Sequence, residues 1–276
     1  MTKLPLYIVD AFTAERFRGN PASVCMLESE LPESAMQMIA GEMNHSETAF
    51  ALPLGGSPRV ATRFSLRWFT PEVEVPLCGH ATLATAAVIL RVLGNSASTI
   101  QFETKSGILS ARRDGTGIAL DFPAEVGEPT KVTPEVLAAL GVREVKGAWW
   151  VREDRNLLLE LGSESEVRGL APDFTRLQAS RGDAPFLGVI VTAAGTGGFD
   201  FVTRYFAPWI GIDEDPVTGV AHCALTPYWA RRTGKSEMRA YQASRRGGEM
   251  TVRLKGNRVD LVGDAVIVAE GTLRLD

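Results

Sequence analysis

Short apolar runs separated by turn residues predict a chain built mostly of strands with a few helices. Residues 5–12 and 22–27 are two such runs, and the turn signal Gly-Asn-Pro at 19–21 lies between them. Apolar positions at helical spacing follow a Pro-Glu-Ser sequence and predict a helix over residues 32–43. A second, capped helix is predicted over residues 133–141.

The segment 123–131 is rich in proline, glycine and charged residues and is the best candidate for a linker. At 276 residues the chain is near the size at which a single hydrophobic core stops growing, so two domains are expected. We predict an N-terminal domain at residues 1–122 and a C-terminal domain at 132–263. The last strand, 264–276, is a candidate to complete the first domain.

A repeated pattern relates the two predicted domains. The sequence FSLRWFTP aligns with FVTRYFAP, and further along PLCGHATLA aligns with PVTGVAHCA after a single gap. The repeat predicts two similar halves, each a set of strands around one central helix that starts at a glycine and is rich in small residues. The aligned pairs are Phe64 with Phe201, Arg67 with Arg204, Trp68 with Tyr205, Phe69 with Phe206, Pro71 with Pro208, Pro76 with Pro216, Gly79 with Gly219, Ala81 with Ala221, and Ala84 with Ala224.

The two predicted central helices start at Gly79 and Gly219. A helix start carries unpaired backbone N–H groups and a partial positive charge, and glycine lets a ligand approach the backbone closely. We expect the two starts to face each other and to bind an anion without a lysine. A small carboxylate is the natural ligand for such a site.

Side chains that carry protons near neutral pH are concentrated near these helix starts. The chain has three histidines, His45, His80 and His222, and each lies in one of the segments around the predicted site. Glu47 lies between a predicted helix and a predicted strand, and the acidic residues Asp213, Glu214 and Asp215 precede Gly219. Glutamate, histidine and aspartate are common proton carriers, so the pattern favours acid–base chemistry on an anionic substrate.

Structural roles stay open for these residues. Glu47 could pair with an arginine on the surface, and the ring of His80 could satisfy a backbone group at its helix start. Asp215, which precedes Pro216, could serve only as a helix cap. We interpret His45 and His222 as structural.

Composition argues against several classes of function. The formal net charge is -4, whereas binding to nucleic acid needs a concentrated basic surface. Three cysteines without paired spacing do not predict a disulfide scaffold. No long apolar window predicts a membrane span, and the first residues lack the pattern of a secretion signal, so a cytoplasmic location is expected.

Metal and nucleotide sites are not predicted from spacing. The three histidines are far apart and the chain has no CxxC pair, which makes a poor set of metal ligands. The chain has no phosphate loop, and the sequence GTGG at 195–198 lacks the strand-to-helix context of a dinucleotide site. We interpret GTGG as the turn of a hairpin.

Four motifs of this chain resemble those of the phenazine-biosynthesis PhzF-like proteins, relatives of diaminopimelate epimerase. They are VDAFTAERFRGNPASVCML, NHSETAF, RWFTPEVEVPLCGHATLATA and DEDPVTGVAHCALTPYWA, and the resemblance extends over essentially the whole chain. It implies an α+β fold of two pseudo-symmetric domains, each a barrel of strands around a central helix, known as the diaminopimelate epimerase-like fold. It also implies an isomerase that moves a proton without a cofactor.

Carried over to matching positions, the resemblance implies a role for each site residue. Glu47 would be the proton shuttle, with a pKa raised by burial, and His80 and Asp215 would orient the substrate and assist the transfer. Gly79 and Gly219 would mark the anion-binding helix starts, with Cys78, Thr218 and Val220 beside them as further substrate contacts. The resemblance suggests a homodimer.

Two departures keep alternatives open. Val220 stands where the family commonly has a serine, so a hydroxyl donor is missing and a non-catalytic metabolite-binding protein stays possible in principle. Cys78 stands where two-cysteine racemases have one catalytic thiol, but the matching position in the second half is Thr218. Cys223 lies one helical turn further on and cannot replace the second thiol, so a two-base racemase is the less favoured alternative.

Overall fold

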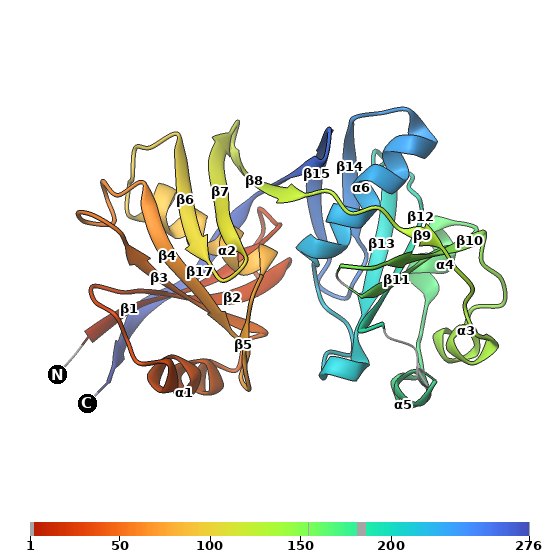
Figure 1. Cartoon of the computed structure of the whole chain (residues 1–276), viewed down its shortest axis with the longest axis horizontal. Helices are drawn as coiled ribbons and strands as arrows, with labels where there is room; N and C mark the ends of the chain where they lie inside the picture. The colour runs from red at the N-terminus through yellow and green to blue at the C-terminus, as the bar shows by residue number, and fades with distance from the viewer. Residues whose placement is uncertain (1–2, 154, 181–185, 276) are drawn as a thin grey trace. The chain divides into compact units, whose positions relative to one another are not determined.

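The computed structural model describes residues 3–153, 155–180 and 186–275. The chain divides into two compact units (Figure 1). Unit 1 is Met1–Phe122 with Leu261–Asp276, and unit 2 is Pro123–Asp260. The second unit thus begins at Pro123 rather than at residue 132 and ends at Asp260 rather than at 263.

Unit 1 is a sheet in which the last strand of the chain pairs with the first. From one edge the strands run β17, β1, β2, β3, β4, β6, β7 and β8, and the β2–β3 and β4–β6 pairs are parallel while the others are antiparallel. The elements are β1 (Lys3–Ala11), β2 (Asn20–Met26), α1 (Glu33–Met43), β3 (Glu47–Pro53), β4 (Arg63–Phe69), β5 (Glu74–Val75), α2 (Gly79–Ala87), the π-helical turn η1 (Val88–Val92), β6 (Thr99–Thr104), β7 (Gly107–Asp114), β8 (Gly117–Pro123) and β17 (Ala265–Arg274).

Unit 2 repeats this order of pairing. Its strands run β9, β10, β11, β12, β13, β14 and β15, with β11–β12 and β13–β14 parallel and the other pairs antiparallel. The elements are β9 (Glu128–Pro129), α3 (Pro134–Leu140), β10 (Gly147–Val151), β11 (Asn156–Glu160), α4 (Glu164–Gly169), α5 (Phe174–Ala179), β12 (Gly188–Ala194), β13 (Phe201–Phe206), the 3-10 turn η2 (Pro208–Ile210), α6 (Gly219–Thr233), β14 (Glu237–Gln242) and β15 (Gly248–Lys255). Strand β16 (Arg258–Gly263) begins in unit 2 and ends in unit 1.

Each unit surrounds one central helix. All nine residues of α2 are buried, and the helix packs against β1, β2, β3 and β17. Helix α6 buries Gly219 and most of the residues that follow it, and it packs against β14 and β15. Alanine and glycine at these positions allow the strands to approach closely. The fold is therefore α+β with two pseudo-symmetric halves, as the repeat predicts.

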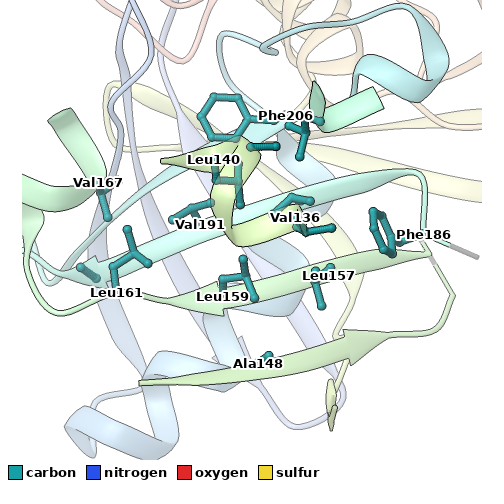
Figure 2. Packing of buried hydrophobic residues seen from close by; sticks show 14 of the residues in the cluster. Val136, Leu140, Ala148, Leu157, Leu159, Leu161, Val167, Phe186, Val191 and Phe206 are labelled. Carbon is teal, nitrogen blue, oxygen red and sulfur yellow. The ribbon is translucent and has the colours of Figure 1, made fainter. Parts of the chain in front are cut away.

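Further helices cover the outer side of each sheet. In unit 1, Met36, Ile39 and Ala40 of α1 pack with Phe50 and Phe69. In unit 2, α3, α4 and α5 lie over β10 to β13 and close a larger apolar core (Figure 2). This core includes Val136, Leu140, Leu157, Leu159, Val167, Val191 and Phe206. Each unit thus has a hydrophobic core of its own.

The predicted linker is wrong for part of its length, because residues of this segment belong to unit 2. Strand β9 pairs with β10, with Trp149 opposite Pro129. Pro227 inside α6 has no N–H to give to the carbonyl of Cys223, and that carbonyl accepts a hydrogen bond of 3.1 Å from the Glu125 amide instead. The helix break thus becomes an attachment point for the segment.

Other local predictions are confirmed. Helix α1 starts at Glu33, and α3 ends at Gly141, whose φ of 74° is the left-handed conformation that glycine adopts easily. The segment 195–198 joins β12 to β13 as a hairpin. The three cysteines are buried, and none of the described helices is long and apolar enough to cross a membrane.

Candidate active site

Helix α2 starts where the sequence places it, at Gly79. Cys78 is the N-cap residue, with an extended backbone and no capping hydrogen bond from its side chain. The preceding segment is fixed by the Ser106 hydroxyl, which donates to the carbonyl of Pro76 at 2.8 Å. The N-terminal amides of a helix have no partner within the helix, so this start is suited to an anionic group.

Glu47 and His80 are brought together in unit 1. Glu47 is the first residue of β3, His80 is the second residue of α2, and Glu47 Oε2 lies 3.2 Å from His80 Nε2. The two side chains are 13% and 6% exposed, so the contact is largely shielded from water. Burial lowers the pKa of His80 to about 3, with the nearby charge of His45 acting in the same direction. The ring is therefore neutral at neutral pH, so its close approach to Glu47 is not an ion pair.

Three further side chains surround the His80 ring. Asn20 Nδ2 lies 3.2 Å from Nδ1 and Cys78 Sγ lies 3.5 Å from the same nitrogen. The Ser46 hydroxyl lies 3.4 Å from Nε2, on the side of Glu47. A buried imidazole with partners at both nitrogens has a fixed ring orientation. Asn20 and Ser46 were not predicted from the sequence, where Asn20 was interpreted only as part of a turn.

Glu47, Cys78 and His80 form a group with the chemistry of a metal site. One ligand atom from each lies within 4.8 Å of the others, and thiolate, imidazole and carboxylate are all ligands of Zn²⁺. Spacing along the chain does not reveal this group, because its three residues form neither a histidine pair nor a CxxC motif. Glu47 contacts Nε2 and Cys78 contacts Nδ1, so a single ion would need these side chains to rearrange.

Asp215 belongs to a second polar group, in unit 2. Its Oδ2 accepts a hydrogen bond of 2.5 Å from the Thr218 hydroxyl, and its amide donates to the carbonyl of Tyr205. The fully buried side chain of Gln242, at the end of β14, accepts from the Thr218 amide and donates to the Asp215 carbonyl, both at 2.8 Å. Gln242 also donates to the Thr218 hydroxyl at 3.1 Å. Gln242 was not predicted as part of the site.

Thr218 is the N-cap residue of α6, which starts at Gly219 as expected. Val220 follows in the first turn and is half-buried. His222 is fully buried and its Nδ1 donates to the Thr218 carbonyl at 2.8 Å, which agrees with the structural role predicted for it. His45 lies in unit 1, where its Nδ1 is 2.7 Å from the Ser23 hydroxyl.

Glu214 is an ion-pair partner, which corrects its place among the candidate acids. Arg204 on β13 donates to both Glu214 carboxylate oxygens, at 2.7 and 3.0 Å. In unit 1, Arg67 on β4 donates to both oxygens of Glu74, at 2.7 and 2.6 Å. Each glutamate stands two residues before the proline that leads into its central helix. We call these two pairs the arginine clamps.

Further details repeat between the halves. The Ser244 hydroxyl donates to the Pro216 carbonyl at 2.8 Å, the same contact that Ser106 makes with Pro76. In α2 the Thr82 hydroxyl donates to the carbonyl of the N-cap residue, and in α6 His222 donates to the equivalent carbonyl. The two helix starts are thus stabilised by equivalent hydrogen bonds.

Comparisons with known proteins agree with this architecture. The family model described as phenazine biosynthesis-like protein, PhzC-PhzF, matches residues 9–271. A mouse protein, phenazine biosynthesis-like domain-containing protein 2, is 48% identical over 285 residues, which cover 98% of this chain and 99% of that protein. A Pseudomonas aeruginosa protein with the name uncharacterized isomerase is 44% identical over 273 residues, which cover 99% of this chain and 100% of that protein.

Solved structures give the same result. A PhzF-family protein from Enterococcus faecalis superposes with a TM-score of 0.92 at 43% identity, and the match covers 99% of this chain and 100% of that one. A hydroxyproline epimerase from Agrobacterium vitis has a TM-score of 0.63 at 12% identity over 100% of this chain and 92% of its own, which shows a shared epimerase-type fold. The chain belongs to the phenazine biosynthesis-like (PhzC-PhzF) family.

Proposed function

We propose that this protein is a cofactor-independent isomerase of small carboxylates in which Glu47 carries the proton. The family and the name of the Pseudomonas aeruginosa relative support an isomerase or epimerase. The observation that supports Glu47 most is its 3.2 Å contact with a neutral, buried His80 beside the start of α2. A carboxylate in that setting has a neutral ring beside it and little water to compete for protons.

In the proposed reaction Glu47 removes a proton from one substrate carbon and returns it to another. The electrons of the broken C–H bond move through the substrate. The proton held on Glu47 can exchange with solvent before it is returned to form the new C–H bond, so no other reactant is consumed. The His80 ring lies beside the carboxylate, with Nε2 3.2 Å from Glu47 Oε2, and limits where the carboxylate can move. The amides at the start of α2 are available for the substrate carboxylate.

Asp215 and the start of α6 keep the roles predicted for them, as groups that orient the substrate. Their support is local: Asp215 is nearly buried, and the Thr218 hydroxyl and Gln242 fix its position. Val220 offers no hydrogen-bond donor from its side chain. We therefore expect a substrate that lacks the polar group held by the serine of other family members.

The proposal is tested by solvent-deuterium exchange into a panel of cyclic and amino-acid carboxylates, followed by NMR. Glu47→Gln should abolish exchange and leave binding largely intact, because glutamine keeps the shape but cannot accept the proton. Glu103→Gln is the matched control, since Glu103 forms an exposed ion pair with Arg63 on the sheet of the same unit. Exchange that persists in Glu47→Gln contradicts the mechanism. Binding by the native protein without exchange of any ligand would instead support a metabolite-binding protein.

A further inference from the structure

Asn20 has a tightly fixed position next to His80. It is the first residue of β2, opposite Ala11 of β1, and it is fully buried. Gly19 before it has a φ of 62°, and a Cβ there would lie 2.1 Å from the Ala11 carbonyl oxygen. Only glycine is tolerated at such a place. The turn therefore fixes the position of the Asn20 side chain next to His80.

The contact between Asn20 and His80 defines which ring nitrogen carries the proton. An amide NH₂ group can only donate, so His80 Nδ1, 3.2 Å from Asn20 Nδ2, must present its lone pair. Cys78 Sγ, at 3.5 Å from the same nitrogen, is also placed to donate its S–H. In a neutral ring the proton then resides on Nε2, which faces Glu47 Oε2 at 3.2 Å.

We propose that Asn20 is a positioning residue that holds His80 as its Nε2–H tautomer, so that an N–H group, and not a lone pair, lies on the side of the Glu47 carboxylate. With the other tautomer, two acceptors would face each other at 3.2 Å and the carboxylate would be repelled. The catalytic meaning of this inference rests on the proposed function of Glu47. The tautomer itself does not, because it is a property of the resting protein.

The groups that bear on the protonation of His80 are few. Glu47 and Cys78 contact the ring, and His45 acts on it through its charge. Burial keeps the ring neutral over the ordinary pH range. A change of the Asn20 amide to a carboxylate would add a fourth group and reverse the direction of the hydrogen bond at Nδ1.

The first test is the tautomer of the unmodified protein, measured by long-range ¹H–¹⁵N NMR of the histidine rings. The chain has three histidines, so His45→Gln and His222→Gln suffice for assignment. His222 is an internal reference, because its Nδ1 faces a carbonyl, which can only accept, and it must be the Nδ1–H tautomer. We expect His80 to show a proton on Nε2 alone. A proton on Nδ1 of His80 in the native protein overturns the inference.

The second test replaces the amide. Asn20→Asp should place a proton on His80 Nδ1, and Asn20→Leu should give a mixture of tautomers. Deuterium exchange by Asn20→Asp should fall roughly 10- to 100-fold, the range seen when the partner that orients a functional histidine is lost, and its pH profile should shift. Asn95→Asp is the control, since Asn95 is equally buried in unit 1 but donates to the carbonyls of Pro58 and Ala61.

The outcomes separate this inference from the proposed function. If Glu47→Gln abolishes exchange while Asn20→Asp leaves both the tautomer and the pH profile unchanged, Glu47 is the proton carrier and Asn20 has no positioning role. If native His80 is the Nε2–H tautomer and Asn20→Asp reverses it, but Glu47→Gln still exchanges, the tautomer assignment holds and the role of Glu47 is wrong.

Discussion

Arg204 binds both carboxylate oxygens of Glu214, and Arg67 binds both oxygens of Glu74 at the matching place in the other half. In both halves the guanidinium also lies over a phenylalanine ring, 4.9 Å from the Phe206 centroid and 5.1 Å from that of Phe69. Two-point binding of a planar carboxylate by a planar guanidinium fixes both position and orientation. The segment before each central helix is therefore anchored to the strand that precedes it.

Arg204 is the more buried of the two clamp arginines, with a side-chain exposure of 10% against 28% for Arg67, and its partner Glu214 is 19% exposed. Arg204→Met should lower the free energy of unfolding by about 3 kcal/mol, because it leaves Glu214 buried without a cation. Urea unfolding measures this effect. Arg152→Met is the control, since the pair of Arg152 with Glu128 is about two-thirds exposed and its loss should change stability by about 0.5 kcal/mol or less. Equal effects of the two substitutions would contradict a structural role for the clamp.

Two buried histidines should make the protein sensitive to mild acid. Burial lowers the pKa of His80 to about 3 and that of His222 to about 4, whereas an unfolded histidine titrates near pH 6.5. Between these values the unfolded chain binds protons that the folded chain does not, so stability is full above about pH 6.5 and falls as the pH is lowered toward 4. Each histidine should contribute about 1 kcal/mol per pH unit.

This pH dependence is checked by urea unfolding at several pH values from 7 down to 4.5. His222→Gln should flatten the dependence by about half, because one of the two sites is gone. An unfolding free energy that does not change across this range would show that both rings accept protons in the folded protein.

Cys78→Ala distinguishes the one-carboxylate mechanism from a two-base racemase. With Glu47 as the only proton carrier, exchange should fall by less than about tenfold, since general acid–base groups contribute far more than this. A two-base racemase would use the Cys78 thiol as one of its two bases, so the substitution would remove nearly all of its activity. Cys223→Ala is the matched control, because Cys223 is a buried thiol inside α6. Loss of exchange in Cys78→Ala alone would favour the racemase.

Gln242→Met should destabilise unit 2 by about 2 kcal/mol, because it removes the partners of the Thr218 amide and the Asp215 carbonyl inside the protein. Thermal or urea unfolding reports the loss. Gln37→Met gives a comparison, since Gln37 also donates to two carbonyls but does so near the surface. If Gln242→Met lowers the free energy of unfolding no more than Gln37→Met does, Gln242 is not needed to keep Asp215 and Thr218 in place.

The parts of the fold that could be predicted from the sequence are those encoded locally. A proline shortly before a glycine marks both helix starts. The aligned aromatic strands reveal the repeat because equivalent residues occupy equivalent positions in the two halves. Arg67 and Arg204 were aligned in this way, although their carboxylate partners were not foreseen. The sequence around Glu214 indicates only a candidate acid, because its arginine partner lies outside the acidic segment, on β13.

The parts that could not be predicted depend on contacts between distant segments. Asn20 and His80 are 60 residues apart in the chain, and nothing near Asn20 distinguishes it from an ordinary turn asparagine. Gln242 lies on a strand well beyond the helix start that it holds. The connection between the units was interpreted as a linker because its composition is typical of one, whereas the carbonyl released by Pro227 fixes it to α6.

The arginine clamps that anchor the helix starts are separate from the side chains at the starts that would contact the substrate. The arginine clamp of each half anchors the segment before its helix, and the side chains at the two starts differ: Cys78 and His80 in one half, Thr218 and Val220 in the other. Such a scaffold can acquire a new specificity by altering one half while the other stays as it was. Substitutions aimed at changing substrate choice should therefore target Cys78 and Val220 and leave both arginines untouched.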